Sequence, residues 1–219
     1  MKQHFINEIR NLLRLIETQG GRVEHVIEQA ITAACKADTE LAGQIIAGDQ
    51  LIDSEELRIE EECLKVLALY QPVASDLRTI VAILKINTGL ERMADFGVHI
   101  AERVPGIRQH LDSGHDELLN FRTMEQGALA MLRDALTAMK NADTILAYSV
   151  IEKDELIDKA HRDNILLARD ALRRFPEQSG YYIDCIAISR DLERIADIAS
   201  DICEHIIYLE TGKIIRHRV

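Results

Sequence analysis

The chain has 219 residues and a formal charge of −11, from 26 Lys and Arg residues against 37 Asp and Glu residues. This acidity argues against a surface that neutralises nucleic-acid phosphates, and no basic run with interleaved aromatic residues occurs. Hydrophobic residues make up 47% of the chain but aromatic residues only 4%, so any core is built mainly from aliphatic side chains, as in packed helices.

The N-terminal segment has scattered charges and no continuous apolar stretch, which argues against a signal peptide or a membrane span. We therefore expect a cytoplasmic protein that does not insert into a membrane. The four cysteines have no short spacing, which favours buried thiols over disulfides or a zinc site.

Helical periodicity runs almost unbroken between the three prolines, and no strand-like alternation competes with it. Start and stop signals predict six long helices, at residues 4–35, 38–70, 75–104, 114–148, 150–174 and 180–210. The predicted N-caps are Asp38, Ser75, Ser113 and Ser179; the predicted ends are Pro105-Gly106 for the third helix and Thr211-Gly212 for the sixth.

Two stretches of the sequence repeat. LERMADFGVHI contains Glu91 and LERIADIASDI contains Glu193, a displacement of 102 residues. A weaker match relates DQLID, which begins at Asp49, to DELID, which begins at Asp154. Because the motifs have the same order in both halves, we predict an all-α tandem repeat of two antiparallel three-helix bundles, at residues 1–108 and 109–219.

Each predicted repeat contains two acid pairs spaced i, i+4, and each pair continues an apolar stripe of its helix. The pairs are Asp49/Asp53 and Glu91/Asp95 in the first repeat, and Asp154/Asp158 and Glu193/Asp197 in the second. Carboxylates one turn apart repel each other, and burying them unpaired is costly, so a cationic partner is needed.

A polyvalent cation explains this spacing better than the adjacent Arg92 and Arg194, because neighbouring helical residues point about 100° apart. Two facing pairs would surround a hard cation such as Mg²⁺, Mn²⁺, Ca²⁺ or iron with carboxylate oxygens. His99 and Asp201 lie one turn further and are candidate ligands, so the first site could include nitrogen while the second would be all oxygen.

Two plainer interpretations stay open. His99 could be an ordinary half-buried histidine, and the repeated acids could be surface charges that gene duplication copied. The pairs Glu24/Glu28 and Asp112/Asp116 have no counterpart in the other repeat, and we interpret them as solvated.

Residues 71–104, QPVASDLRTIVAILKINTGLERMADFGVHIAERV, resemble the signature of the PhoU proteins, and residues 184–214 resemble its second copy. The opening segment HFINEIRNLLRLIETQGGRVEHVIEQAI is similar to the first helix of that family. The resemblance implies E(D)xxxD motifs that hold metal ions, often in multinuclear clusters, at the four acid pairs.

The chain departs from the family pattern in two places. The family usually has Gly before the motif Asp and Asn one turn later, whereas this chain has Ala94 and Ala196, then His99 and Asp201. The resemblance therefore implies divalent or ferric ions without fixing iron, manganese, magnesium or zinc, and two non-equivalent sites are compatible with it.

The resemblance also implies a regulator that represses the phosphate-starvation response and limits phosphate uptake. Its partners would be the ATPase subunit of a phosphate ABC transporter and a membrane sensor histidine kinase, and the sequence leaves open whether it forms a homodimer. No nucleotide-binding motif or catalytic constellation occurs, so we expect no enzyme. The alternatives are a di-metal carboxylate redox enzyme of the oxidase or ferroxidase type, although Glu-x-x-His is missing, and a purely structural metal.

Overall fold

The computed structural model describes residues 2–110 and 120–212, and every regular element in these ranges is a helix. In chain order they are α1 Lys2–Lys36, α2 Thr39–Tyr70, α3 Ser75–Glu102, α4 Val104–His110, α5 Phe121–Asn141, α6 Thr144–Arg174, the short 3-10 helix η2 Pro176–Gln178, and α7 Ser179–Thr211. None of the described helices combines the length and the apolar character that crossing a membrane requires.

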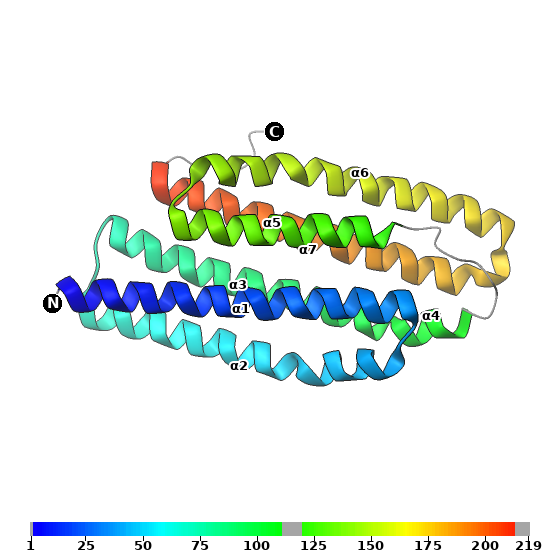
Figure 1. Ribbon diagram of the computed structural model, residues 1–219, viewed down its shortest axis with the longest axis horizontal. Coiled ribbons are helices and arrows are strands. Elements are labelled where there is room, and N and C mark those ends of the chain that lie inside the picture. The colour runs from blue at the N-terminus through cyan, green and yellow to red at the C-terminus, as the bar shows by residue number, and fades with distance from the viewer. Residues whose placement is uncertain (1, 111–119, 213–219) are drawn as a thin grey trace.

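The long helices lie side by side in an elongated molecule (Figure 1). Helices α1, α2 and α3 form one antiparallel bundle, and α5, α6 and α7 form the other. The bundles pack together through α1 against α5 and α3 against α7, with α2 and α6 on the outside. The predicted all-α fold is thereby confirmed; the division at residues 108 and 109 stays a prediction.

Two predicted helix ends are wrong. Helix α3 ends at Glu102, and Pro105-Gly106 lies inside the additional short helix α4, because proline is tolerated in the first turn of a helix. The fourth and fifth long helices meet at residues 142 and 143 and not at 149. At the end of α7, the predicted stop is confirmed: Gly212 adopts a left-handed conformation with φ 69°.

The turn between α5 and α6 repeats the turn between α1 and α2. The sequence Ala-Asp-Thr occurs at 37–39 and again at 142–144, a displacement of 105 residues. Ala37 and Ala142 both have positive φ, at 47° and 52°. Asp38 and Asp143 then accept the amide of the residue three positions later, each at 3.0 Å, as N-caps. This repeated tripeptide marks the helix boundary that periodicity alone misses.

The other predicted N-caps have different outcomes. Asp38 is confirmed, while Ser75 and Ser179 are wrong, because each is the first helical residue and the residue before it makes no side-chain capping bond. Ser113 and the acid pair Asp112/Asp116 lie outside the described residues.

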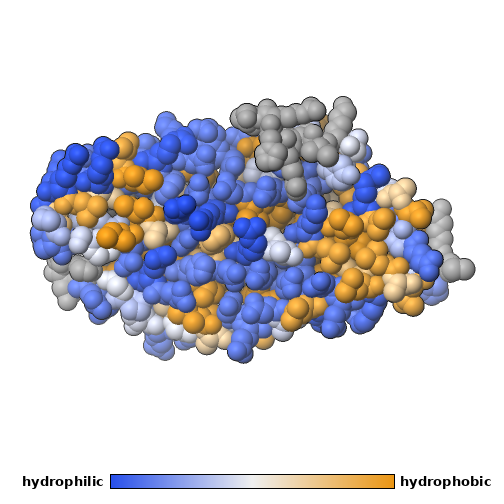
Figure 2. All heavy atoms as spheres, turned by 180° about the vertical axis from the view of Figure 1, so that it is seen from behind, coloured by the Kyte–Doolittle hydropathy of each residue, from blue (hydrophilic) through white to orange (hydrophobic). Residues whose placement is uncertain are grey.

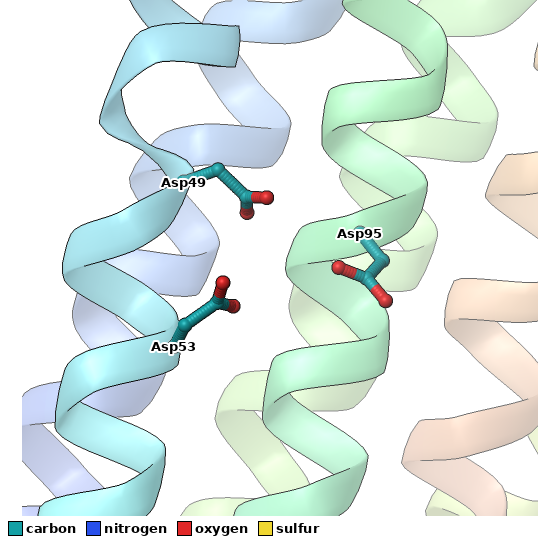
Figure 3. A group of neighbouring side chains, drawn as sticks. All are labelled: Asp49, Asp53 and Asp95. Atoms are coloured by element: carbon teal, nitrogen blue, oxygen red, sulfur yellow. The ribbon is translucent and has the colours of Figure 1, made fainter.

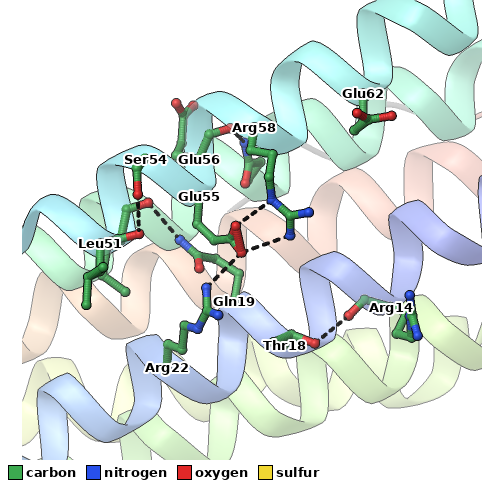
Figure 4. Close-up of polar contacts among 12 residues, drawn as sticks. Arg14, Thr18, Gln19, Arg22, Leu51, Ser54, Glu55, Glu56, Arg58 and Glu62 are labelled. Atoms are coloured by element: carbon green, nitrogen blue, oxygen red, sulfur yellow. Dashed lines mark hydrogen bonds and ion pairs between the residues drawn. The ribbon is translucent and has the colours of Figure 1, made fainter.

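Helix α2 is braced from both sides at the stretch that carries acidic residues. From α1, the buried Gln19 amide donates to the Ile52 carbonyl at 3.1 Å, and beside it Arg22 binds Glu55 at 2.8 Å (Figure 4). From α3, the Asn87 amide donates to the Glu56 carbonyl at 2.8 Å. Two buried side chains thus fix the rotation of α2 about its axis near Asp53.

The two bundles share one hydrophobic core, to which α1, α3, α5 and α7 all contribute. An exposed ion pair adds to this interface, since Arg133 of α5 binds both Glu24 and Glu28 of α1. Both acids lie at the surface, and their i, i+4 spacing on α1 also lets both carboxylates reach one guanidinium, which the sequence did not reveal.

Candidate metal centres

The first group of carboxylates lies where α2 packs against α3, on the side away from α1 (Figure 3). Asp49 and Asp53 project from α2 towards Asp95 of α3, and each offers an oxygen within 4.8 Å of the other two. Asp53 is exposed and the other two are half-buried, so the group opens to solvent. The sequence predicts that the Asp49/Asp53 pair faces the acidic residues of the third helix, and the structure places this pair opposite Asp95.

The second group repeats this arrangement between α6 and α7. Asp154, Asp158 and Asp197 also offer oxygens within 4.8 Å of one another, and they occupy the positions equivalent to the first group. Each three-aspartate group therefore takes two ligands from one helix turn and one from the neighbouring helix.

Burial and mutual repulsion make these groups hard to ionise together. Burial, followed by the charges of Asp197 and Asp158, raises the pKa of Asp154 to about 7. Burial and the neighbouring Glu193 raise the pKa of Asp197 to about 6. The pKa of Asp49 is raised for the same reason, by burial and then by Asp53 and Asp95. A bound cation would relieve both effects.

One buried oxygen in each group has no hydrogen-bond partner. These are Oδ1 of Asp49 and Oδ1 of Asp154, both buried and equivalent in the two repeats. Buried polar atoms are normally satisfied, and a cation bound at this place would satisfy the equivalent oxygen in both repeats. An all-oxygen donor set of this kind fits a hard cation.

Glu91 and Glu193 extend the groups by one turn but are not among the three carboxylates that meet within 4.8 Å. Burial, followed by the charges of Asp95, Glu56 and Asp53, raises the pKa of Glu91 to about 7. Burial and then Asp158 raise the pKa of Glu193, while two arginines oppose the shift. Both glutamates therefore adjoin the three-aspartate groups.

His99 and Asp201 also lie beside the groups and outside them. His99 is exposed, packs against the edge of Phe96 with ring centroids 5.9 Å apart, and acts electrostatically on Asp49. Asp201 is exposed and helps to raise the pKa of Asp154 and Asp197.

Sequence reasoning missed Glu56, which faces Glu91 and Asp53 from α2. The signal was available, because Glu56 lies seven residues after Asp49 and therefore on the same helix face. Its counterpart in the second repeat is His161, whose Nδ1 lies 2.9 Å from the Ser189 hydroxyl. A search for repeated acids passes over this position because the second repeat has no acid there.

Comparisons with known proteins agree with this architecture. The PhoU domain model matches residues 16–104 and 121–206. A phosphate-specific transport system accessory protein PhoU homolog from Pseudomonas putida is 35% identical over 217 residues, which cover 99% of this chain and 84% of the relative. A homolog of the same name from Aquifex aeolicus is 35% identical over 196 residues, covering 90% and 88%.

Solved structures give the same result. The crystal structure of PhoU from Pseudomonas aeruginosa superposes with a TM-score of 0.86 at 31% identity, covering 95% of this chain and 100% of that one. The phosphate transport system regulatory protein PhoU from Streptococcus pneumoniae has a TM-score of 0.84 at 30% identity, with 96% and 99% covered. Because sequence and structure match across both repeats, this chain belongs to the PhoU family.

Proposed function

We propose that this protein is a metal-binding, non-enzymatic regulator of a phosphate transport system. The observation that carries the metal-binding part is the pair of three-aspartate groups, each with one orphaned buried oxygen. The relatives' names as phosphate-specific transport system accessory proteins support the regulatory part. The ligands in this proposal are the three-aspartate groups, with Glu91, Glu193, His99 and Asp201 as adjoining donors for divalent or ferric ions.

The proposed partners are the ATPase subunit of a phosphate ABC transporter and a sensor histidine kinase of the phosphate-starvation response. The protein would act by binding them in the cytoplasm and thereby limit phosphate uptake. A carboxylate-bridged redox enzyme has less support, because such sites draw ligands from four helices, whereas each group here draws on two.

Metal content tests the sites directly. Asp53→Asn and Asp158→Asn should each remove roughly half of the bound metal, because each removes a ligand from one of two separate sites. Elemental analysis by mass spectrometry measures metal per chain on protein purified without a metal-affinity tag or chelator. Asp163→Asn is the matched control, since it removes an exposed carboxylate of α6 outside the group.

Two outcomes would contradict this proposal. Loss of all metal from either single variant would mean one site shared between the repeats. Metal-free wild-type protein that is fully folded would mean that the aspartates serve another purpose.

The partners are tested by affinity capture of the full chain with the ATPase subunit of the same organism's phosphate transporter. Capture by this subunit, with none by the ATPase subunit of an unrelated ABC transporter, is the expected result. A deletion strain that still represses its starvation genes in phosphate-rich medium would sink the regulatory proposal.

A further inference from the structure

Helices α3 and α7 cross the interface between the repeats in antiparallel orientation, and positions 77–102 on α3 have equivalents on α7 displaced by 102 residues. The contact between them therefore has two equivalent halves. Figure 2 shows the molecule from this side, with strongly hydrophilic side chains across its middle and apolar patches towards both ends. The two halves differ in one respect. In one half an aspartate side chain lies between the helices, and in the other half glycine stands at the equivalent position and leaves a pocket.

The filled half is built around Asp191 of α7, which is only 5% exposed. Its Oδ2 lies 3.7 Å from Nε of Arg103, whose guanidinium also lies 3.8 Å from Asp184. Two further cationic groups, His99 and Arg194, act on the same carboxylate and oppose the effect of its burial. The carboxylate of Asp191 thus lies among three basic side chains in this half of the contact.

The hollow half is a solvent-open pocket of about 390 Å³ between α3 and α7, called the cavity below. Gly89 stands where the other half has Asp191, so no side chain enters from that position. Arg92 occupies the place of Arg194, and His205 occupies the place of Arg103. Lys85, whose counterpart is Ala187, adds a cation that the filled half lacks.

Neither Lys85 nor Arg92 forms an ion pair with any residue in the described part of the chain. One carboxylate, Asp201, lies on the cavity wall in the place of His99, and it also acts on Asp154 and Asp197 on the α6 side. Lys85 and Arg92 are both exposed to solvent on the wall of this cavity.

We propose that this cavity binds a small oxyanion, whose oxygens take the position that the Asp191 carboxylate holds in the other half. The hydroxyl of Thr88 on the same wall is engaged with the Glu56 carboxylate, and Ile198 and Ile202 form an apolar surface beside Gly89. The chemistry is shared by a carboxylate and by inorganic phosphate, both of which accept charge-assisted hydrogen bonds from Lys and Arg. None of the six aspartates of the two three-aspartate groups lines this cavity, although the adjoining Asp201 does.

The test is isothermal titration calorimetry of the full chain with inorganic phosphate and, separately, with acetate. We expect saturable binding of at least one anion, and the two titrations identify which class it belongs to. Lys85→Gln should weaken binding about tenfold or more, because it removes a charged hydrogen-bond donor. The matched control is Arg78→Gln, an exposed cation two turns earlier on α3 that does not line the cavity.

A second variant reproduces the filled half. Gly89→Asp places a carboxylate in the cavity and should abolish binding, at the cost of a small shift of Ile198, whose Cγ2 would lie 3.2 Å from the new Cβ. Circular dichroism and metal content, measured for every variant, separate loss of this site from loss of the fold or of the metal sites.

Three results would overturn the proposal. The first is the absence of saturable heat with either anion up to about 10 mM, which is weaker than typical specific binding. The second is equal affinity of Lys85→Gln and Arg78→Gln, which would place the bound anion elsewhere. The third is unchanged binding by a folded Gly89→Asp.

Discussion

The partly buried carboxylate of Asp154 makes the stability of the metal-free protein depend on pH. Its pKa of about 7 lies well above the usual value for an aspartate, because the folded chain favours the neutral form. Below the usual pKa of an aspartate, the carboxyl group is protonated in both the folded and the unfolded state, so the free energy of unfolding does not depend on its ionisation. As pH rises towards 7 the unfolded chain ionises freely while the folded chain resists, so stability falls.

We therefore predict that metal-free protein has a lower Tm at pH 8 than at pH 5, and that metal-loaded protein shows a smaller decrease. Asp154→Asn should make the decrease in Tm between pH 5 and pH 8 smaller, because the amide does not ionise. Thermal denaturation by circular dichroism at the two pH values measures the effect. An identical pH dependence in metal-free wild type and Asp154→Asn would show that burial of this carboxylate does not control it.

At the element scale, the alanine turns between helices carry a local conformational cost. Ala37 and Ala142 adopt left-handed conformations, which glycine reaches without the steric conflict of a Cβ atom. The turns persist because Asp38 and Asp143 cap the following helices and because the antiparallel packing fixes both helix ends.

Ala142→Gly should accordingly raise the free energy of unfolding by up to about 1 kcal/mol. The same chemical change at Ala47, exposed inside α2, should lower it by about 1 kcal/mol, because glycine weakens a helix interior. Urea denaturation measures the free energy of unfolding of both variants. Destabilisation of similar size at both positions would show that the left-handed conformation of Ala142 carries no conformational cost.

How far the sequence predicts these elements depends on which signal each one has. The long helices and the facing aspartates follow from the 3.6-residue period, which places residues four apart on one face. The α5–α6 boundary escapes this reasoning because alanine is the strongest helix former, so Ala142 reads as helix interior. Glu56 escapes because His161 replaces it in the second repeat, and the cavity at Gly89 escapes because it arises from packing between distant helices.

At the scale of the whole molecule, two kinds of ion pair join the repeats. The Arg133 pair with Glu24 and Glu28 lies at the surface, where solvent screens the charges. Arg103 instead faces the nearly buried carboxylate of Asp191. Removing the partly exposed Arg103 leaves the charge of the buried Asp191 without this partner, which costs more than the loss of an exposed contact.

The prediction is that Arg103→Met lowers the free energy of unfolding by about 2 kcal/mol, and Arg133→Met by less than about 1 kcal/mol. Chemical denaturation gives both values. Adding Asp191→Asn to Arg103→Met should recover part of the loss, because the orphaned charge is then gone. Equal costs for the two arginines would mean that Asp191 is not held by Arg103.

The antiparallel pairing of α3 with α7 has one more consequence. In a dimer of identical single repeats, every substitution would appear on both sides of the symmetry axis, and a carboxylate placed in one half would fill the other as well. Here the two halves are parts of one chain, so Asp191 and Gly89 can differ while the backbone around them keeps the same design. Covalent fusion thus gives this molecule the freedom of a heterodimer without the need for two subunits to find each other.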